Sequence, residues 1–172
     1  MKNIIFILLG VLLTIPAMAQ QEDRGYIVKV GDQCPDFDLV LEDGSTTSLS
    51  KLEGKIFMLQ FTASWCGVCR KEMPHIEKDI WIKNKDKGLV VIGVDRGENL
   101  ETVKKFAETM KISYPLALDE DESIFQKFAH PKAGVTRNIL VNKNGEIIYL
   151  TRLFNTEEFD GLKNRITEEL SK

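Results

Sequence analysis

Trp65-Cys66-Gly67-Val68-Cys69 decides the fold assignment, because this stretch follows an apolar run at residues 56–61 and opens a predicted helix. Unpaired backbone N–H groups and the positive end of the helix dipole stabilise an anion at a helix N-terminus. In that position a cysteine can have a pKa of roughly 3.5–7.5, against about 8.5 for free cysteine. Cys66 is therefore predicted to be a nucleophilic thiolate near neutral pH.

The second cysteine of the motif lies three residues after the first. On a helix, Cys69 therefore shares a face with Cys66, and the two can form an intramolecular disulfide. Cys66, in the first turn, is expected to attack a disulfide in another protein. Cys69, one turn deeper, is expected to attack Cys66 and release the product.

Two simpler interpretations of the motif remain open. A purely structural disulfide that spans two residues would remove little entropy from the unfolded chain, because the stabilisation grows with loop length. Half of a zinc site would need further ligands, and the sequence offers Cys34, His75 and His130. Redox chemistry is the favoured interpretation.

The start of the chain has the pattern of a signal peptide. Lys2 supplies a positive charge, residues 4–15 are almost wholly apolar, and Ala17-Met18-Ala19 is a small-residue cleavage pattern. The apolar run is shorter than the roughly 20 residues of a membrane helix, although an uncleaved anchor stays open. We expect a signal peptide at residues 1–19, a flexible segment at 20–30 and one domain at 31–172. Export would place the protein in the periplasm, where a dithiol needs a dedicated reductant.

Charge excludes one class of partner. The net charge of -3 and the pI near 5.5 provide no basic footprint for nucleic acid.

Strand-like and helix-like segments alternate along the rest of the chain. The order of segments predicts an α/β fold with a central mixed sheet, helices on both faces and an N-terminal hairpin extension. The expected strands lie at residues 37–41, 46–49, 56–62, 89–95, 114–118, 139–141 and 147–150, and the expected helices at 66–84, 99–111, 121–129 and 156–170.

The sequence is identified as a member of the thioredoxin superfamily, and over about residues 31–170 it resembles exported thiol-disulfide oxidoreductases of the TlpA and ResA type. The residues that carry the resemblance are Pro35-Asp36-Phe37-Asp38-Leu39 with Gly44, Leu52-Glu53-Gly54-Lys55, the stretch from Phe61 through both cysteines to Pro74, and Asn142 to Gly145. The resemblance implies a thioredoxin-like fold and dithiol-disulfide exchange with protein substrates, most simply as a reductase. It also implies a transmembrane thiol carrier as electron donor and substrates such as apocytochrome c. No cofactor and no metal are expected.

The resemblance also directs attention to the proton that Cys69 must lose before it attacks. Thioredoxin carries an aspartate six residues before its first cysteine, and here Gln60 occupies that position and cannot titrate. In ResA-like proteins a glutamate after the following central strand approaches the dithiol, and Glu98 matches it. Glu98 is therefore the expected proton acceptor, and its alternative role is that of a solvent-facing residue at a helix start.

One position departs from the family pattern. Family members place a cis-proline opposite the dithiol, and here Thr136 occupies that position, where a trans peptide is the default. Trp65 and Thr136 are expected to line the substrate groove. Peroxiredoxins also lack this proline and carry an arginine nearby, so Arg137 permits a thiol peroxidase as an alternative. The simpler expectation is that Arg137 faces solvent.

A second alternative is a Cu(I) carrier that uses Cys66 and Cys69 with His75 or His130. The copper-carrying relatives space their cysteines one residue wider, which counts against this alternative. Cys34 is expected to be a small apolar residue, not a third redox centre.

Overall fold

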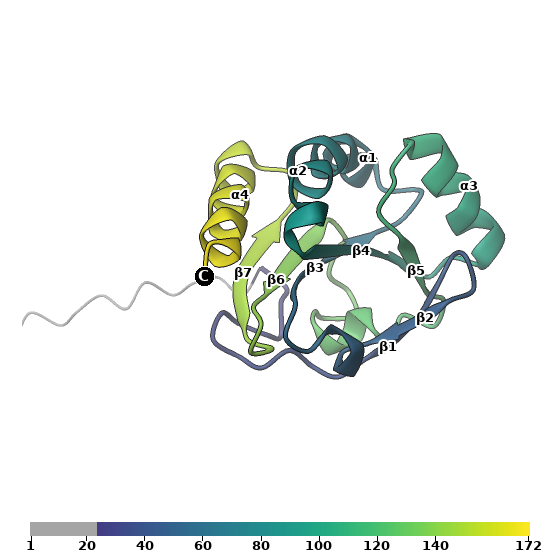
Figure 1. Cartoon of the computed structure of the whole chain (residues 1–172). Helices are drawn as coiled ribbons and strands as arrows, with labels where there is room; N and C mark the ends of the chain where they lie inside the picture. Colours follow the sequence, from purple (N-terminus) through teal and green to yellow (C-terminus); the bar gives the residue numbers. More distant parts are fainter. Residues whose placement is uncertain (1–23) are drawn as a thin grey trace, which may run out of the picture.

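A mixed seven-stranded sheet forms the centre of the computed structural model, which describes residues 24–172 (Figure 1). The strand order is β2-β1-β5-β4-β3-β6-β7. The predicted signal peptide at residues 1–19 lies outside the described residues. Within residues 24–172, no helix is long and apolar enough to cross a membrane.

The strands follow the apolar runs of the sequence. Strand β3 is buried along its whole length and pairs in parallel with β4, as expected for central strands covered on both faces. The β6–β7 hairpin pairs antiparallel to β3. The strands are β1 (Asp38–Leu41), β2 (Thr46–Ser48), β3 (Ile56–Thr62), β4 (Leu89–Arg96), β5 (Leu116–Asp119), β6 (Arg137–Val141) and β7 (Ile147–Arg152).

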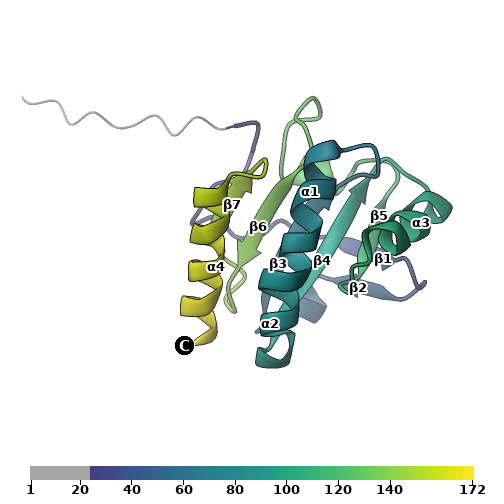
Figure 2. The same ribbon diagram turned by 90° about the horizontal axis from the view of Figure 1, so that it is seen from above.

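Four α-helices cover one face of the sheet (Figures 1 and 2). Inward side chains of α1, α3 and α4 form one hydrophobic cluster with the sheet, in which Met73, Val103 and Ile166 are fully buried. The helices are α1 (Gly67–His75), α2 (Ile82–Asn84), α3 (Leu100–Met110) and α4 (Thr156–Leu170).

The predicted helix at residues 66–84 is continuous but not regular. Pro74 lies inside α1 and has no backbone N–H to donate. Beyond it, the π-helical turn η2 (Ile76–Trp81) and the 3-10 turn η3 (Lys85–Lys87) flank α2. A π-helical turn accommodates a local change in the hydrogen-bond ladder, so the helix continues past the proline.

The second face of the sheet is covered by shorter elements. The 3-10 helix η1 (Ser50–Leu52), the 3-10 helix η4 (Phe125–Lys127) and residues before β1 pack there on a second hydrophobic cluster. The expected helix at residues 121–129 is wrong, because only η4 is helical in it. The Asp119 carboxylate accepts the backbone N–H groups of Ile124 and Phe125 at 2.9 and 2.8 Å, which holds this segment in turns.

Residues 24–30 contact the domain, although the 20–30 segment was expected to be flexible. Tyr26 is buried, bridges to Ala129 and donates its hydroxyl to the Thr151 carbonyl at 2.5 Å. Burial raises the pKa of Tyr26. This part of the chain therefore belongs to the second face of the sheet.

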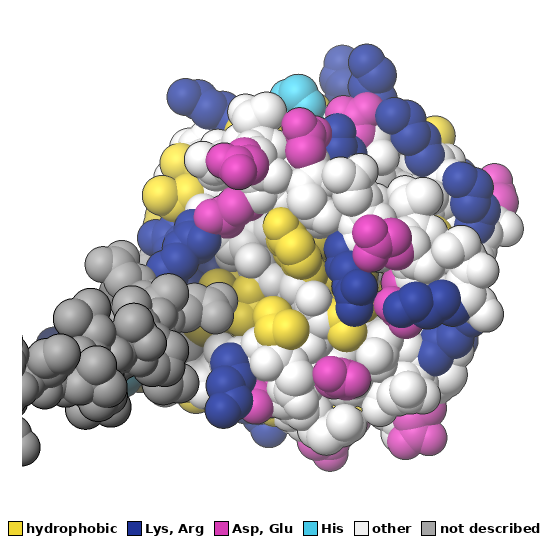
Figure 3. Space-filling view, turned by 90° about the vertical axis from the view of Figure 1, so that its left-hand side faces the viewer, with side chains coloured by type: hydrophobic (Ala, Val, Ile, Leu, Met, Phe, Trp, Pro, Cys, Tyr) yellow, Lys and Arg dark blue, Asp and Glu magenta, His cyan; other side chains and the backbone are white. Residues whose placement is uncertain are grey.

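The outer face of α4 carries charges of both signs. Lys163 pairs with Asp160 at 2.7 Å, and Arg165 pairs with Glu168 at 3.3 Å. On the side of the molecule shown in Figure 3, acidic and basic side chains are interspersed. Exposed pairs of this kind contribute little to stability.

Candidate active site

The paired cysteines lie at the N-terminus of α1. Cys66 is the N-cap residue, and its sulfur accepts the backbone N–H of Cys69 at 3.2 Å. The two cysteines form a disulfide with their Cα atoms 5.3 Å apart. When the disulfide is reduced, the same N–H group and the helix dipole stabilise a Cys66 thiolate.

The two sulfurs differ in access to solvent. Cys66 is 8% exposed, whereas Cys69 is 0% exposed. Cys66 opens onto a hollow of about 260 Å³ beside Trp65, which is 65% exposed. A partner protein can therefore reach Cys66 first, and Cys69 lies behind it. The hollow is lined by Trp65, Cys66, Gly67, Val68, Gly134, Val135, Thr136, Arg152 and Leu153.

Thr136 lies against both cysteines. Its hydroxyl oxygen is 3.1 Å from the Cys66 sulfur and 3.0 Å from the Cys69 sulfur. The residue is 2% exposed and has a φ of +49°, and none of the peptide bonds in residues 24–172 is cis. The position of the family's proline is thus occupied by a side chain that contacts the reactive sulfurs.

The structure does not bring Glu98 into a hydrogen bond with either cysteine. Its two carboxylate oxygens accept the backbone N–H of Ser64 at 2.5 Å and the Ser64 hydroxyl at 2.6 Å. Ser64 precedes Cys66 by two residues, so Glu98 holds the loop that leads into α1.

Asp95 is a buried neighbour of Glu98 that the sequence analysis missed. Asp95 is 0% exposed, and its carboxyl group lies beside that of Glu98. Burial, and after it the negative charge of Glu98, raises the pKa of Asp95 to about 8. Asp95 is therefore protonated at neutral pH.

A second buried carboxyl group, Glu72, lies closer in sequence to the dithiol. Glu72 follows Cys69 by three residues, so it lies on the same side of α1, and it is 1% exposed. Its carboxylate accepts the amides of Asn138 at 2.8 Å and Gln60 at 3.3 Å. Burial raises the pKa of Glu72 to about 7, although these two hydrogen bonds oppose the shift. Glu72 could have been identified from the sequence, because it is a glutamate at an inward position of the predicted helix.

Strand β6 connects this carboxyl group to the disulfide. Thr136 is the residue before β6, and Asn138 is the second residue of that strand. Thr136 contacts the sulfurs and Asn138 contacts Glu72. The hydroxyl of Tyr114 donates to Gln60 at 2.8 Å and completes a buried polar network under α1.

The expectation that Arg137 faces solvent is wrong. Its side chain is 1% exposed, lies over the Tyr26 ring at 4.4 Å and donates to the carbonyl oxygens of Gly134 and Arg24 at 2.9 and 2.7 Å. Strand β6 is flanked by β3 and β7, and residues 24–30 cover its second face, so Arg137 points away from α1. A peroxidatic role would require Arg137 to contact Cys66, and these contacts do not include that cysteine.

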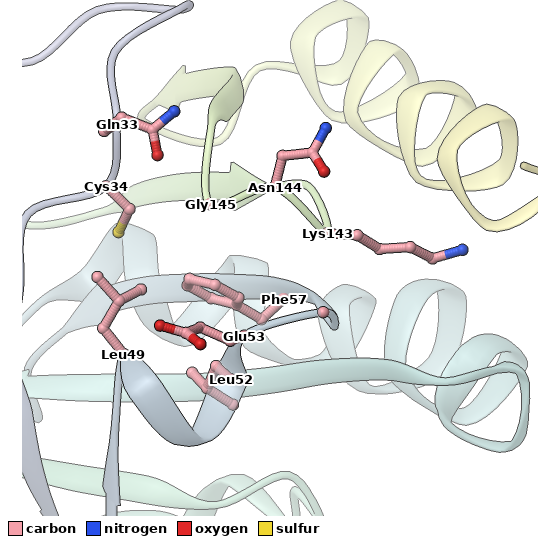
Figure 4. A pocket seen from close by; sticks show the side chains of 10 residues that line it. Gln33, Cys34, Leu49, Leu52, Glu53, Phe57, Lys143, Asn144 and Gly145 are labelled. Atoms are coloured by element: carbon pink, nitrogen blue, oxygen red, sulfur yellow. The ribbon is translucent and has the colours of Figure 1, made fainter.

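Cys34 lies at the end of β6 that is remote from Thr136. It is buried beside a hollow of about 380 Å³, where its sulfur points toward Leu49 (Figure 4). Burial raises the pKa of Cys34 to about 12, so its thiol is inert at neutral pH. Within residues 24–172, no three His, Cys, Asp or Glu side chains come together to hold a metal ion.

Glu72 is expected to make stability depend on pH. The carboxyl group ionises near 4.5 when unperturbed and near 7 in the folded protein, so the folded state holds an extra proton between these values. The free energy of unfolding should therefore fall as pH rises from 4.5 to 7, by up to about 3 kcal/mol. Denaturant unfolding of the wild type and Glu72→Gln at pH 5 and pH 8 measures the difference. The exposed Glu108→Gln is the control, and parallel pH curves for wild type and Glu72→Gln would contradict the prediction.

The fold and the paired cysteines define a thiol-disulfide oxidoreductase of the thioredoxin type. The chain belongs to the AhpC/TSA family, whose sequence profile matches residues 30–150.

Relatives with known names agree with this class. The chain is 30% identical over 150 residues to the thiol-disulfide oxidoreductase ResA of Oceanobacillus iheyensis. The aligned residues cover 85% of this chain and 77% of the relative. A solution structure from Bacteroides thetaiotaomicron, described as a candidate protein disulfide isomerase, is 54% identical with a TM-score of 0.83 and covers 86% of this chain and 94% of that one. The thioredoxin domain of a Bacteroides vulgatus thiol-disulfide oxidoreductase is 26% identical with a TM-score of 0.69, covering 82% and 97%.

Proposed function

We propose that the protein is a cell-envelope reductase that reduces disulfide bonds in other proteins. The observation that carries the proposal is the position of Cys66 as the N-cap of α1, with the Cys69 N–H on its sulfur and Cys69 buried behind it. This geometry favours the thiolate form of Cys66, the form that attacks disulfides.

The reaction follows from the different exposure of the two sulfurs. The Cys66 thiolate attacks one sulfur of a substrate disulfide, the substrate S–S bond breaks, and the other substrate sulfur leaves as a thiolate. Cys69 then loses its proton and attacks Cys66, and the second substrate sulfur leaves with the bonding electron pair. The protein dithiol is oxidised to a disulfide and the substrate disulfide is reduced to a dithiol.

The proposed location and partners rest on the N-terminal sequence and on the ResA-like relatives. Residues 1–19 would direct export, and an exported dithiol has to be reduced again after each turnover. A transmembrane thiol carrier is the proposed electron donor. Proposed substrates are secreted proteins with wrong disulfides or apocytochrome c. Mass spectrometry of the exported protein should find Gln20 at its N-terminus, and a retained leader would indicate a membrane anchor.

A turnover assay tests the proposed activity. Catalytic amounts of the mature protein should accelerate the reduction of insulin disulfides by dithiothreitol. Cys34→Ser, which changes the cysteine remote from the site, should keep this activity. No acceleration by the wild-type protein would overturn the proposal.

The proposal includes Glu98 as the proton acceptor for the dithiol. Glu98 contacts the loop before Cys66 and, with Asp95, forms a pair of carboxyl groups at the end of β4. Glu72 is the competing acceptor, because it lies three residues from Cys69 and its pKa near 7 permits proton exchange at neutral pH.

Replacing each carboxyl group separately distinguishes the two acceptors. Glu98→Gln is expected to raise the apparent pKa of the dithiol or to slow resolution of the mixed disulfide by at least about tenfold. Thiol titration and insulin turnover measure the two effects, with Glu72→Gln assayed in parallel. Unchanged titration and turnover in Glu98→Gln, together with a slow Glu72→Gln, would assign the proton to Glu72.

A further inference from the structure

The Thr136 hydroxyl lies almost midway between the two reactive sulfurs. Its oxygen is 3.1 Å from Cys66 and 3.0 Å from Cys69, within hydrogen-bond reach of each. A hydroxyl has one proton to donate and lone pairs to accept with. Rotation about its C–O bond therefore redirects the proton from one sulfur to the other while the oxygen stays in place.

The backbone of Thr136 is held in an uncommon conformation. Its φ of +49° lies in the left-handed region, which β-branched residues avoid. The Thr136 carbonyl accepts the backbone N–H of Leu153 at 2.9 Å, and the side chain is 2% exposed. Surrounding contacts thus keep a strained residue in place, and such strain is concentrated at functional sites.

We propose that the Thr136 hydroxyl is a catalytic hydrogen-bond donor that switches between Cys66 and Cys69 during turnover. The inference deepens the proposed disulfide exchange and rests on it. In the reduced protein, the hydroxyl donates to the Cys66 thiolate and accepts the Cys69 S–H. Cys66 then has two donors, because the backbone N–H of Cys69 lies 3.2 Å from its sulfur.

In the second half of the reaction, the hydrogen bond that the hydroxyl donates moves from Cys66 to Cys69. Once Cys66 is bonded to the substrate sulfur, it carries no charge and no longer needs the donor. Cys69 loses its proton to a nearby carboxylate, and the hydroxyl donates to the new Cys69 thiolate. That thiolate attacks Cys66, the Cys66–substrate bond breaks, and the substrate sulfur leaves as a thiolate. A hydrogen bond to a charged sulfur is stronger than one to a neutral sulfur, so the donor follows the charge.

Other titratable and charged groups lie on the elements around the pair and are not altered when Thr136 is changed. They are Glu72 and Arg70 on α1, Asp95 on β4, Glu98 after β4, and Arg152 at the end of β7. Substituting Thr136 alone therefore isolates the contribution of its hydroxyl.

Thr136→Val tests the proposal, because valine has the same branched shape and lacks the hydroxyl. The pH dependence of alkylation of reduced protein measures the apparent pKa of Cys66, which should rise by about one unit or more. Reaction with dithionitrobenzoate gives two releases of thionitrobenzoate, and the second release, which reports attack by Cys69, should slow about tenfold at neutral pH. Thr136→Ser keeps the hydroxyl and should resemble the wild type in both measurements.

Two results would overturn the inference. One is a Thr136→Val protein with the Cys66 titration and second release of the wild type. The other is an equal change in Thr136→Val, which loses the hydroxyl, and in Thr136→Ser, which keeps it, because the effect would then not follow the hydroxyl. If Thr136→Val does not fold, Thr136→Ala is compared with Thr136→Ser, because these two side chains differ only by the hydroxyl. If the wild-type protein did not accelerate insulin reduction, the proposed function would be contradicted. Failure of the proposed function and failure of the Thr136 inference are therefore distinguishable.

Discussion

Replacing Cys69 by serine is expected to convert the protein from a catalyst into a covalent trap. Cys66 remains the N-cap of α1 and can still attack a substrate disulfide. Without the second thiol, the mixed disulfide cannot be resolved internally, so it should accumulate. Cys66→Ser should reduce insulin turnover to the rate without protein, because serine supplies no thiolate. Non-reducing gels and mass spectrometry of each variant after reaction with a disulfide substrate measure these outcomes.

Cys34→Ser is the matched control for both cysteine variants. Cys34 is buried at the far end of β6, and its raised pKa keeps the thiol neutral. This variant should turn over like the wild type and should trap nothing. If Cys69→Ser turned over normally, or if Cys66→Ser formed the mixed disulfide instead, the assignment of attack to Cys66 would be wrong.

Phe61→Ala is expected to lower the free energy of unfolding by about 3–5 kcal/mol. Phe61 is fully buried in the second-face cluster, just before the loop that leads to the cysteines. The centroid of its ring lies 5.3 Å from that of the Phe125 ring, edge to face, and 5.4 Å from that of the Phe128 ring. Truncation therefore leaves a cavity and removes two aromatic contacts. Denaturant titration should show a lower midpoint with an unchanged slope.

Ile82→Ala provides the comparison for this prediction. Ile82 is 47% exposed on α2, so its truncation removes little buried surface and should cost well under 1 kcal/mol. Equal losses in Phe61→Ala and Ile82→Ala would mean that the cluster around Phe61 does not contribute as its burial indicates.

The regular elements were predictable because their patterns are local. The helix expected at residues 156–170 has those bounds in the structure, and the Asn155 side chain caps it by accepting the Glu158 N–H at 3.1 Å. The central strands were predictable from unbroken apolar runs. The order of these elements predicted a mixed α/β sheet, and the family resemblance implied the thioredoxin-like fold.

Two features could not be predicted from the sequence, because each depends on contacts between residues that are not adjacent in the chain. The apolar spacing of residues 121–129 resembles a helix, but the Asp119 carboxylate binds two backbone N–H groups and favours turns. Arg137 is buried because residues 24–30 lie over β6, and the sequence contains no local sign of that contact.

The candidate proton acceptors could be compared only in the structure. Glu98 was selected from a family pattern, and the structure shows its carboxylate on Ser64. Glu72 could have been noticed as a glutamate one turn beyond Cys69 on the inward side of the helix. Its partners Gln60 and Asn138 come from β3 and β6, so its raised pKa could be read only from the fold.

The redox potential of the Cys66/Cys69 couple tests the central claim most directly. The mature protein is equilibrated with glutathione buffers, and the fraction of disulfide is measured by alkylation and mass spectrometry, with Cys66→Ser as the blank. A reductase should show a reversible two-electron couple near the thioredoxin end of the range from about -270 to about -120 mV. A potential near the oxidising end would mean that the protein inserts disulfides, and failure to form the intramolecular disulfide would contradict thiol-disulfide exchange altogether.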